Sequence, residues 1–313
     1  MEKKNRLILL YKRRTFTEKI NDTFDFLREN FRQLASWLTY LLLPVSIVLA
    51  VSMNDMMGNY AAAFGMPGRL GEELDSIVLS YLLMMVMGFL TTALGISATY
   101  GAMRLYEQRP GRLQGLGLKD LVPYIKRGTL RMLLLSLLAV PVAGVAIVVV
   151  AMMSMLLTSM SVALGLSVML LLYMAVPLVL LPLLLAAPVY LFEDDTTVLQ
   201  AFIKAWRLGW ATWRGLAAVV IVLGTLVYII IGTASLPVYI LQISKFVTTS
   251  SSEVAQPSVF ASMGMYLLHV VVAYISAMLS SIVYVGLAYQ YGHACDKIDG
   301  AGIEQQIDSF ETL

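Results

Sequence analysis

The chain has 313 residues, of which 59% are hydrophobic and 13% are charged, whereas soluble domains contain about 45–50% apolar and about 25% charged residues. Its apolar runs exceed the roughly 20 residues that cross a hydrocarbon core about 30 Å thick, so a soluble fold is excluded and lipid is the expected solvent. The single cysteine, Cys295, excludes an intramolecular disulfide and a zinc site of several thiolates, and we expect no cofactor.

Residues 1–14 are predicted to form a basic arm beside the membrane. Its cations are Lys3, Lys4, Arg6, Lys12, Arg13 and Arg14. In residues 16–34, apolar side chains recur at spacings of three and four with charged side chains between them, which is the pattern of an amphipathic helix. Thr15 and Glu18 have the spacing of a capping box, which predicts that the helix begins there.

Six segments are apolar and long enough to be transmembrane helices. They are residues 38–53, 77–103, 132–157, 162–192, 216–243 and 260–291. The first begins too far along the chain for a cleaved signal peptide. Pro177, Pro182 and Pro188 lie in the fourth, and each removes a backbone donor, so this span is predicted to be kinked or broken.

The basic residues fall almost entirely on one side of these spans. Twenty lysines and arginines precede the first span, lie between the second and third or the fourth and fifth, or follow the sixth, whereas only Arg69 and Lys245 lie on the other side. By the positive-inside rule the basic side is cytoplasmic. We therefore expect a multi-pass protein of a bacterial cytoplasmic (inner) membrane with both termini in the cytoplasm.

Two further amphipathic helices are predicted on the cytoplasmic side. One starts with a second capping box at Thr197 and Gln200 and has Phe202, Trp206, Trp210 and Trp213 on one face. A weaker one covers residues 120–131. Aromatic and basic side chains both favour the headgroup zone, so we expect these helices at the membrane interface.

The fold class that follows is all-α, a polytopic membrane bundle of six transmembrane and about three amphipathic interfacial helices. Each interfacial helix carries an aromatic–aliphatic–basic triplet, as in Phe26, Leu27 and Arg28, and is followed by a pair of spans. This pattern predicts a membrane domain over 15–297 built from repeats 15–112, 113–193 and 194–297. Residues 298–313 are predicted to be a short polar tail.

Residues 188–226 carry a family resemblance. The matching residues are Glu193, Ala201, Lys204, Trp206, Arg207, Leu208 and Trp213. In these positions the chain resembles a bacterial family of six-span proteins related to the membrane domain of some glycerophosphodiester phosphodiesterases. Those enzymes hold a divalent metal with carboxylates and histidines in a soluble barrel, whereas this chain has only two histidines. The resemblance therefore implies a membrane fold and no catalytic residue.

Polar residues at three places in the sequence are candidate sites. Glu193, Asp194 and Asp195 could bind a metal or a phosphate ester, but acids at this place more often stabilise the start of the helix at Thr197. His293, Cys295 and Asp296 could ligate a soft metal, but a solvated helix end is the expected role. His269 lies near the outer end of the sixth span, where we expect snorkelling or a hydrogen bond to a neighbouring helix.

The strongest functional indication is the set of basic and aromatic residues on the interfacial helices. They are Lys204, Trp206, Arg207, Trp210, Arg28, Arg32, Lys126 and Arg127. We expect them to bind membrane lipids, anionic headgroups in particular, or a membrane-protein partner, and we expect no nucleic acid. The predicted function is a non-enzymatic scaffold or lipid-interacting module. The alternative is a transporter or channel for a neutral or apolar substrate; a membrane hydrolase ranks last.

Overall fold

The computed structural model describes residues 7–65, 70–109, 112–250 and 259–302, and within these ranges every regular element is a helix. Counting residues 162–192 as one span, six helical segments are long and apolar enough to cross a membrane, the architecture of a multi-pass integral membrane protein. The all-α prediction is confirmed. The first five predicted spans lie inside these segments, and the sixth, residues 260–291, lies inside the helix Val259–Ile298.

The elements follow the chain in a simple order. They are α1 (Phe16–Gly65), α2 (Leu70–Gln108), α3 (Leu118–Met160), α4 (Val162–Leu180), the 3-10 helix η2 (Leu181–Leu185), α5 (Ala186–Phe192), α6 (Val198–Ala211), α7 (Trp213–Ser250) and α8 (Val259–Ile298).

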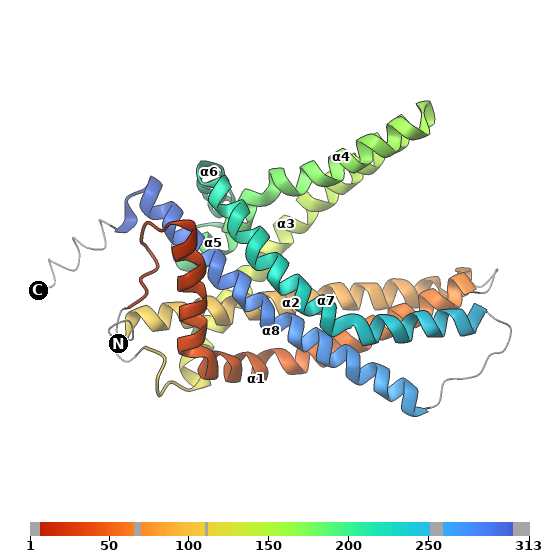
Figure 1. Cartoon of the computed structure of the whole chain (residues 1–313), viewed down its shortest axis with the longest axis horizontal. Coiled ribbons are helices and arrows are strands. Elements are labelled where there is room, and N and C mark those ends of the chain that lie inside the picture. Colours follow the sequence, from red (N-terminus) through yellow and green to blue (C-terminus); the bar gives the residue numbers. More distant parts are fainter. Residues whose placement is uncertain (1–6, 66–69, 110–111, 251–258, 303–313) are drawn as a thin grey trace, which may run out of the picture.

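Two of the predicted amphipathic segments are not separate helices. Residues 16–34 form the beginning of the 50-residue α1, and residues 120–131 form the first turns of α3. Figure 1 shows that α1 bends, so that its first part runs across the direction of the spans. The capping box of Thr15 and Glu18 is confirmed, because each residue's backbone N–H donates to the other's side chain.

The fourth span is broken, as its prolines predict. The α-helix α4 gives way to the 3-10 helix η2, which has Pro182 in its first turn, and then resumes as α5. A proline cannot donate the hydrogen bond that an α-helix needs at that position, so the tighter helix replaces it locally.

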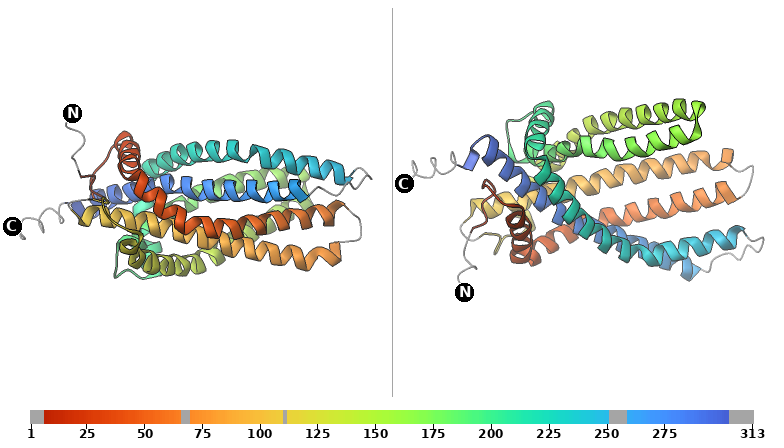
Figure 2. Two further views of the ribbon diagram at one scale, coloured as in Figure 1. Left: turned by 90° about the horizontal axis from the view of Figure 1, so that it is seen from below. Right: turned by 45° about the horizontal axis from the view of Figure 1, so that its top comes forward.

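The spans are arranged as a group of four and a diverging pair. Helices α1, α2, α7 and α8 pack side by side, whereas α3 and α4 form a hairpin that leaves the group at an angle (Figures 1 and 2). The pair touches the group mainly through the first half of α3, which packs on α2. Only Gly165 is buried in α4.

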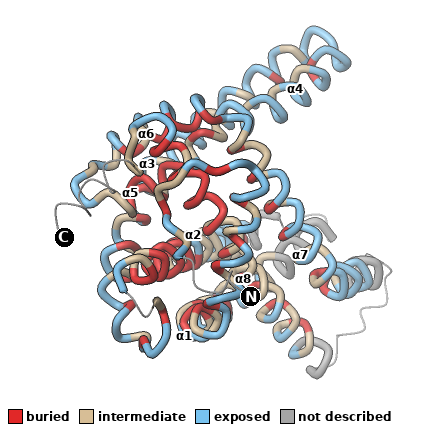
Figure 3. The backbone as a smooth tube through the Cα atoms, turned by 60° about the vertical axis from the view of Figure 1, so that its left-hand side comes forward, coloured by how far each residue is buried: buried red, intermediate tan, exposed pale blue. Residues whose placement is uncertain are grey.

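One end of the bundle is densely packed, and we call it the charged end. It comprises residues 7–37, 104–109, 112–131, 193–214 and 290–302, so that the first and last described segments lie at the same end (Figure 1). The largest fully buried side chains include Tyr106, Leu121 and Leu208. Figure 3 shows buried residues concentrated in this part and the α3–α4 hairpin almost wholly exposed.

Some predicted features fall outside the described residues. They are Lys3, Lys4 and Arg6 of the basic arm, Arg69 on the other side of the spans, and residues 303–313 of the tail. The threefold repeat stays a prediction.

Candidate functional site

A capping box and a buried face fix the position of helix α6 at the charged end. The predicted capping box is confirmed: Thr197 N–H donates to Gln200 Oε1 at 3.0 Å, and Gln200 N–H donates to Thr197 Oγ1 at 3.4 Å. A buried face made of Ala201, Ala205, Leu208 and Gly209 packs α6 against η2 and α5. A Cβ atom at Gly209 would lie 2.5 Å from Pro182 Cα, so the absence of a side chain there is what lets α6 reach the broken span.

The opposite face of α6 is an exposed apolar stripe. It consists of Leu199, Ile203, Trp206 and Trp210, all exposed, at the spacings of four, three and four that place residues on one side of a helix. The rings of Trp206 and Trp210 meet edge to face with 5.7 Å between their centroids. Figure 2 shows α6 standing across the long axis of the spans.

The predicted aromatic face of α6 needs a correction in two positions. Phe202 is only partly exposed, because it packs against the buried core. Trp213 is the first residue of α7. The true stripe is therefore rotated away from Phe202 and includes Leu199 and Ile203 instead.

Glu193 joins three helices through hydrogen bonds. Its Oε1 atom lies 2.8 Å from Lys204 Nζ of α6 and accepts a hydrogen bond of 2.6 Å from Tyr291 of α8. Its Oε2 atom accepts from Thr196 at 3.1 Å. Partial burial disfavours the Lys204 ammonium, but the hydrogen bond and charge of Glu193 outweigh this, so the pKa of Lys204 is raised.

Asp299 extends this network to the end of α8. Arg207 Nη2 donates to both of its carboxylate oxygens, at 2.8 and 3.1 Å, and Lys204 Nζ lies 3.7 Å away. Two cations that we predicted to bind lipid or a partner are thus paired with carboxylates of the protein itself. Reversing their charge would also break these ion pairs.

Asp194 lies within ion-pair distance of three arginines. Its Oδ1 atom lies 3.2 Å from Arg104, 3.3 Å from Arg127 and 3.7 Å from Arg131. Arg131 also donates to the carbonyl oxygens of Glu193 and Thr196. These contacts tie α2 and α3 to the segment between α5 and α6.

The sequence analysis missed the contacts of Arg104 and Arg131 with Asp194, since neither arginine is among the eight residues predicted to bind lipid or a partner. The acidic triplet at residues 193–195 was the available signal, because carboxylates at a cation-rich membrane face attract basic partners. The structure engages Glu193 and Asp194 in ion pairs, and the start of α6 is capped by Thr197.

The remaining predicted cations are free of ion pairs. Arg28, Arg32 and Lys126 are exposed, and no carboxylate of the described residues lies within ion-pair distance of them. Of the eight predicted residues, the structure brings together the four on α6, places Arg127 beside Asp194, and leaves these three on the surface.

The described part of the basic arm lies against the bundle. Arg14 is buried, with its Nε atom 2.7 Å from Asp22 and its guanidinium 4.6 Å from the ring centre of Tyr289. Residues 7–14 therefore form part of the packed charged end, and Arg14 contributes to that packing.

The other candidate polar residues have structural partners. His293 Nδ1 accepts from the Arg14 backbone N–H at 3.0 Å, and Cys295 is buried. His269 contacts Gln242 of α7, with 3.1 Å between the two nitrogens, which confirms the expected hydrogen bond to a neighbouring helix. Among the residues with described positions, no group of three histidine, cysteine or acidic residues could hold a metal.

Comparison with known proteins adds no relative. No family model matches the chain, and neither a curated protein nor a solved structure matches it.

Proposed function

We propose that this integral membrane protein is a non-enzymatic, lipid-interacting module that binds headgroups through the exposed stripe of α6. The observation that carries the proposal is the stripe itself, since a 14-residue helix buries one apolar face and leaves a second, with two tryptophans, uncovered. Tryptophan favours the membrane interface because its ring is apolar and its N–H is polar.

The charge distribution supports an anionic partner. Arg28, Arg32 and Lys126 are exposed cations at the same end as the stripe, and no described carboxylate pairs with them. Each such charge near an anionic leaflet adds about 1 kcal/mol of attraction at most. In this proposal the charged end faces the cytoplasm of a bacterial cell, as the positive-inside rule predicts.

Transport ranks second. The transporter hypothesis rests on the predicted repeat of hairpins and on the proline-broken span, and the break lies where Pro182 packs against Gly209 of α6. A packing role accounts for the break without a substrate pathway.

The test is native mass spectrometry of the protein extracted with its surrounding lipids. Trp206→Ser with Trp210→Ser is expected to lose retained lipid, whereas Tyr173→Ser, which removes an exposed aromatic ring from the α3–α4 hairpin, is expected to retain it. Arg28→Gln with Arg32→Gln is expected to reduce anionic lipid more than zwitterionic lipid. Unchanged lipid retention in the tryptophan variant would refute the proposal.

The ion-paired cations are unsuitable for this test. Lys204 and Arg207 bind Glu193 and Asp299, so their reversal would change the packing as well as any lipid contact. The chosen side chains are exposed, and the buried thiol of Cys295 reports whether each variant stays folded.

A further inference from the structure

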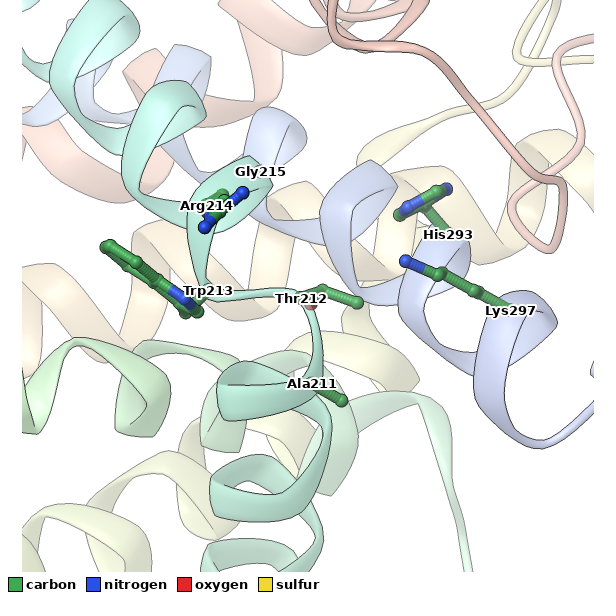
Figure 4. A pocket seen from close by; sticks show the side chains of 7 residues that line it. All are labelled: Ala211, Thr212, Trp213, Arg214, Gly215, His293 and Lys297. Carbon is green, nitrogen blue, oxygen red and sulfur yellow. The ribbon is translucent and has the colours of Figure 1, made fainter.

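A cavity of about 310 Å³ lies at the charged end, beside the junction of α6 and α7. Thr212, Arg214 and Gly215 line it from the junction, and His293 and Lys297 line it from α8. Figure 4 shows His293 and Lys297 projecting from α8 toward the junction. A water molecule occupies about 30 Å³, so the cavity has room for a polyatomic anion with several waters.

The cavity lies beside the start of α7, where Arg214 and Gly215 line it. The first N–H that bonds back into the helix is that of Leu216, which donates to the Thr212 carbonyl oxygen at 3.0 Å. The N–H groups of Arg214 and Gly215 belong to the first turn, which has no partner within the helix and carries the positive end of its dipole.

His293 is held as a donor toward the cavity. Its Nδ1 atom accepts a hydrogen bond from the backbone N–H of Arg14, so the proton of the neutral ring is on Nε2. Together with the Arg214 guanidinium and the Lys297 ammonium, the polar lining is rich in donors.

A buried lysine lies next to Gly215, one of the residues that line the cavity. Lys19 is 3% exposed, and its Nζ atom donates to the amide oxygen of Gln290 at 2.7 Å. A Cβ atom at Gly215 would lie 3.1 Å from this ammonium. Among the described residues no carboxylate lies within ion-pair distance of Lys19, and a buried charge without a counter-charge is costly.

The acids around the cavity are already engaged. Asp296 lies 3.7 Å from Arg13 and accepts from the Gly302 N–H at 2.9 Å, and Asp22 binds Arg14 at 2.7 Å. Among the described residues, the positive charges of Lys19, Arg214 and Lys297 therefore have no carboxylate within ion-pair distance.

We propose that this cavity binds a phosphate group, either as free phosphate or as part of a phosphomonoester lipid headgroup. An ionised phosphate group presents several negatively charged acceptor oxygens, which match the donors of the lining, and its charge offsets the cations around it. This site is separate from the α6 stripe and independent of the proposed lipid binding, because inorganic phosphate can bind to it without a lipid.

The chain offers a specific probe, since it contains only two histidines. We would record ¹⁵N-histidine NMR spectra of the full chain in detergent while adding inorganic phosphate, with sodium chloride added at matched ionic strength as the salt control. The expected result is a saturable shift of His293, with no change at His269, which lies in the opposite half of α8. Arg214→Gln and Lys297→Met are each expected to raise the Kd by at least about tenfold, the loss typical of one charge-assisted hydrogen bond.

Lys119→Gln is the matched control. It removes an exposed cation of the same end that lies outside the cavity, and it is expected to leave the Kd unchanged. Arg214 and Lys297 are exposed, so their variants are expected to fold, and the slow thiol reaction of buried Cys295 checks this.

The same NMR measurement in nanodiscs of defined lipid composition distinguishes a lipid headgroup from free phosphate as the ligand. A His293 shift with phosphatidic acid, but not with phosphatidylcholine alone, supports the site and identifies a headgroup as its ligand. A shift with inorganic phosphate only supports the site and identifies a soluble ligand. The proposal is overturned if none of these probes shifts His293, or if the shift persists unchanged in Arg214→Gln and Lys297→Met.

Discussion

The two halves of α3 lie in different environments. In the first half, Leu121, Ile125, Met132 and Leu135 are buried, whereas beyond them Ser154 is the one buried residue of the helix. In the most apolar stretch of α3 only 6% of residues are buried, compared with 33% for α1. Contacts within the protein thus stabilise the charged end, whereas most side chains of the α3–α4 hairpin face the surroundings of the protein.

Small residues explain part of this difference. At the charged end, a Cβ atom at Gly128 would lie 2.9 Å from Ser97 Cβ and from Leu191 Cδ2, so α2, α3 and α5 approach closely there. Farther along α3, Gly144 has no neighbour within 4 Å. In lipid, where apolar surface alone gives helices little reason to associate, such close approaches supply much of the packing energy.

The largest expected effect contrasts the two halves of α3 directly. Leu121→Ala removes a fully buried side chain and is expected to cost about 2–5 kcal/mol, because it leaves a cavity. Ile147→Ala removes an exposed side chain of the hairpin and is expected to change stability by less than about 0.5 kcal/mol. The measurement is the melting temperature, with unfolding detected by the reaction of a thiol reagent with Cys295, which is buried in the folded protein. Equal losses in the two variants would mean that the hairpin packs against a partner.

An intermediate effect is expected for two glycines. Gly209→Ala forces α6 away from the backbone of Pro182 and is expected to cost about 1–3 kcal/mol through overpacking. Gly144→Ala has open space, and is expected to be neutral or to stabilise by up to about 1 kcal/mol, since alanine is the better helix former. Thiol reactivity again gives the melting temperatures. A tolerated Gly209→Ala would show that α6 is loosely attached and that the charged end is less rigid than its contacts indicate.

The smallest effect concerns the pH dependence of the charged end. Lys204→Met removes the ion pair with Glu193 and is expected to cost about 1 kcal/mol near neutral pH, because the pair is only partly buried. The pKa of Lys204 is raised above its ordinary 10.5, so its stabilisation is fully present below that pH and is lost as the pH rises through the raised value.

The check is the difference in melting temperature between wild type and Lys204→Met across alkaline pH. It should stay constant up to about pH 10, near the ordinary lysine pKa, and shrink above it. A difference that disappears at lower pH would contradict the raised pKa and weaken the role of Glu193 as the link between α5, α6 and α8. Ile147→Ala, which leaves every ionisable group in place, is the control.

The sequence by itself determined the spans, the break in the fourth and the starts of two helices. These are local properties, because a helix in lipid must satisfy its backbone hydrogen bonds within its own segment. Such features can therefore be recognised from the sequence alone. Examples are the hydropathy of residues 216–243, the prolines at 177, 182 and 188, and the capping pair of Thr197 and Gln200.

Only the tertiary structure decided which charges are available to a ligand. Arg104 meets Asp194 and Arg207 meets Asp299 across about ninety residues of sequence, and no periodicity encodes such partners. The same holds for the cavity, since Lys19, Arg214 and Lys297 come from three helices. Their meeting depends on how α1, α7 and α8 pack, because electrostatic interactions follow distance in space, whereas hydropathy follows order along the chain.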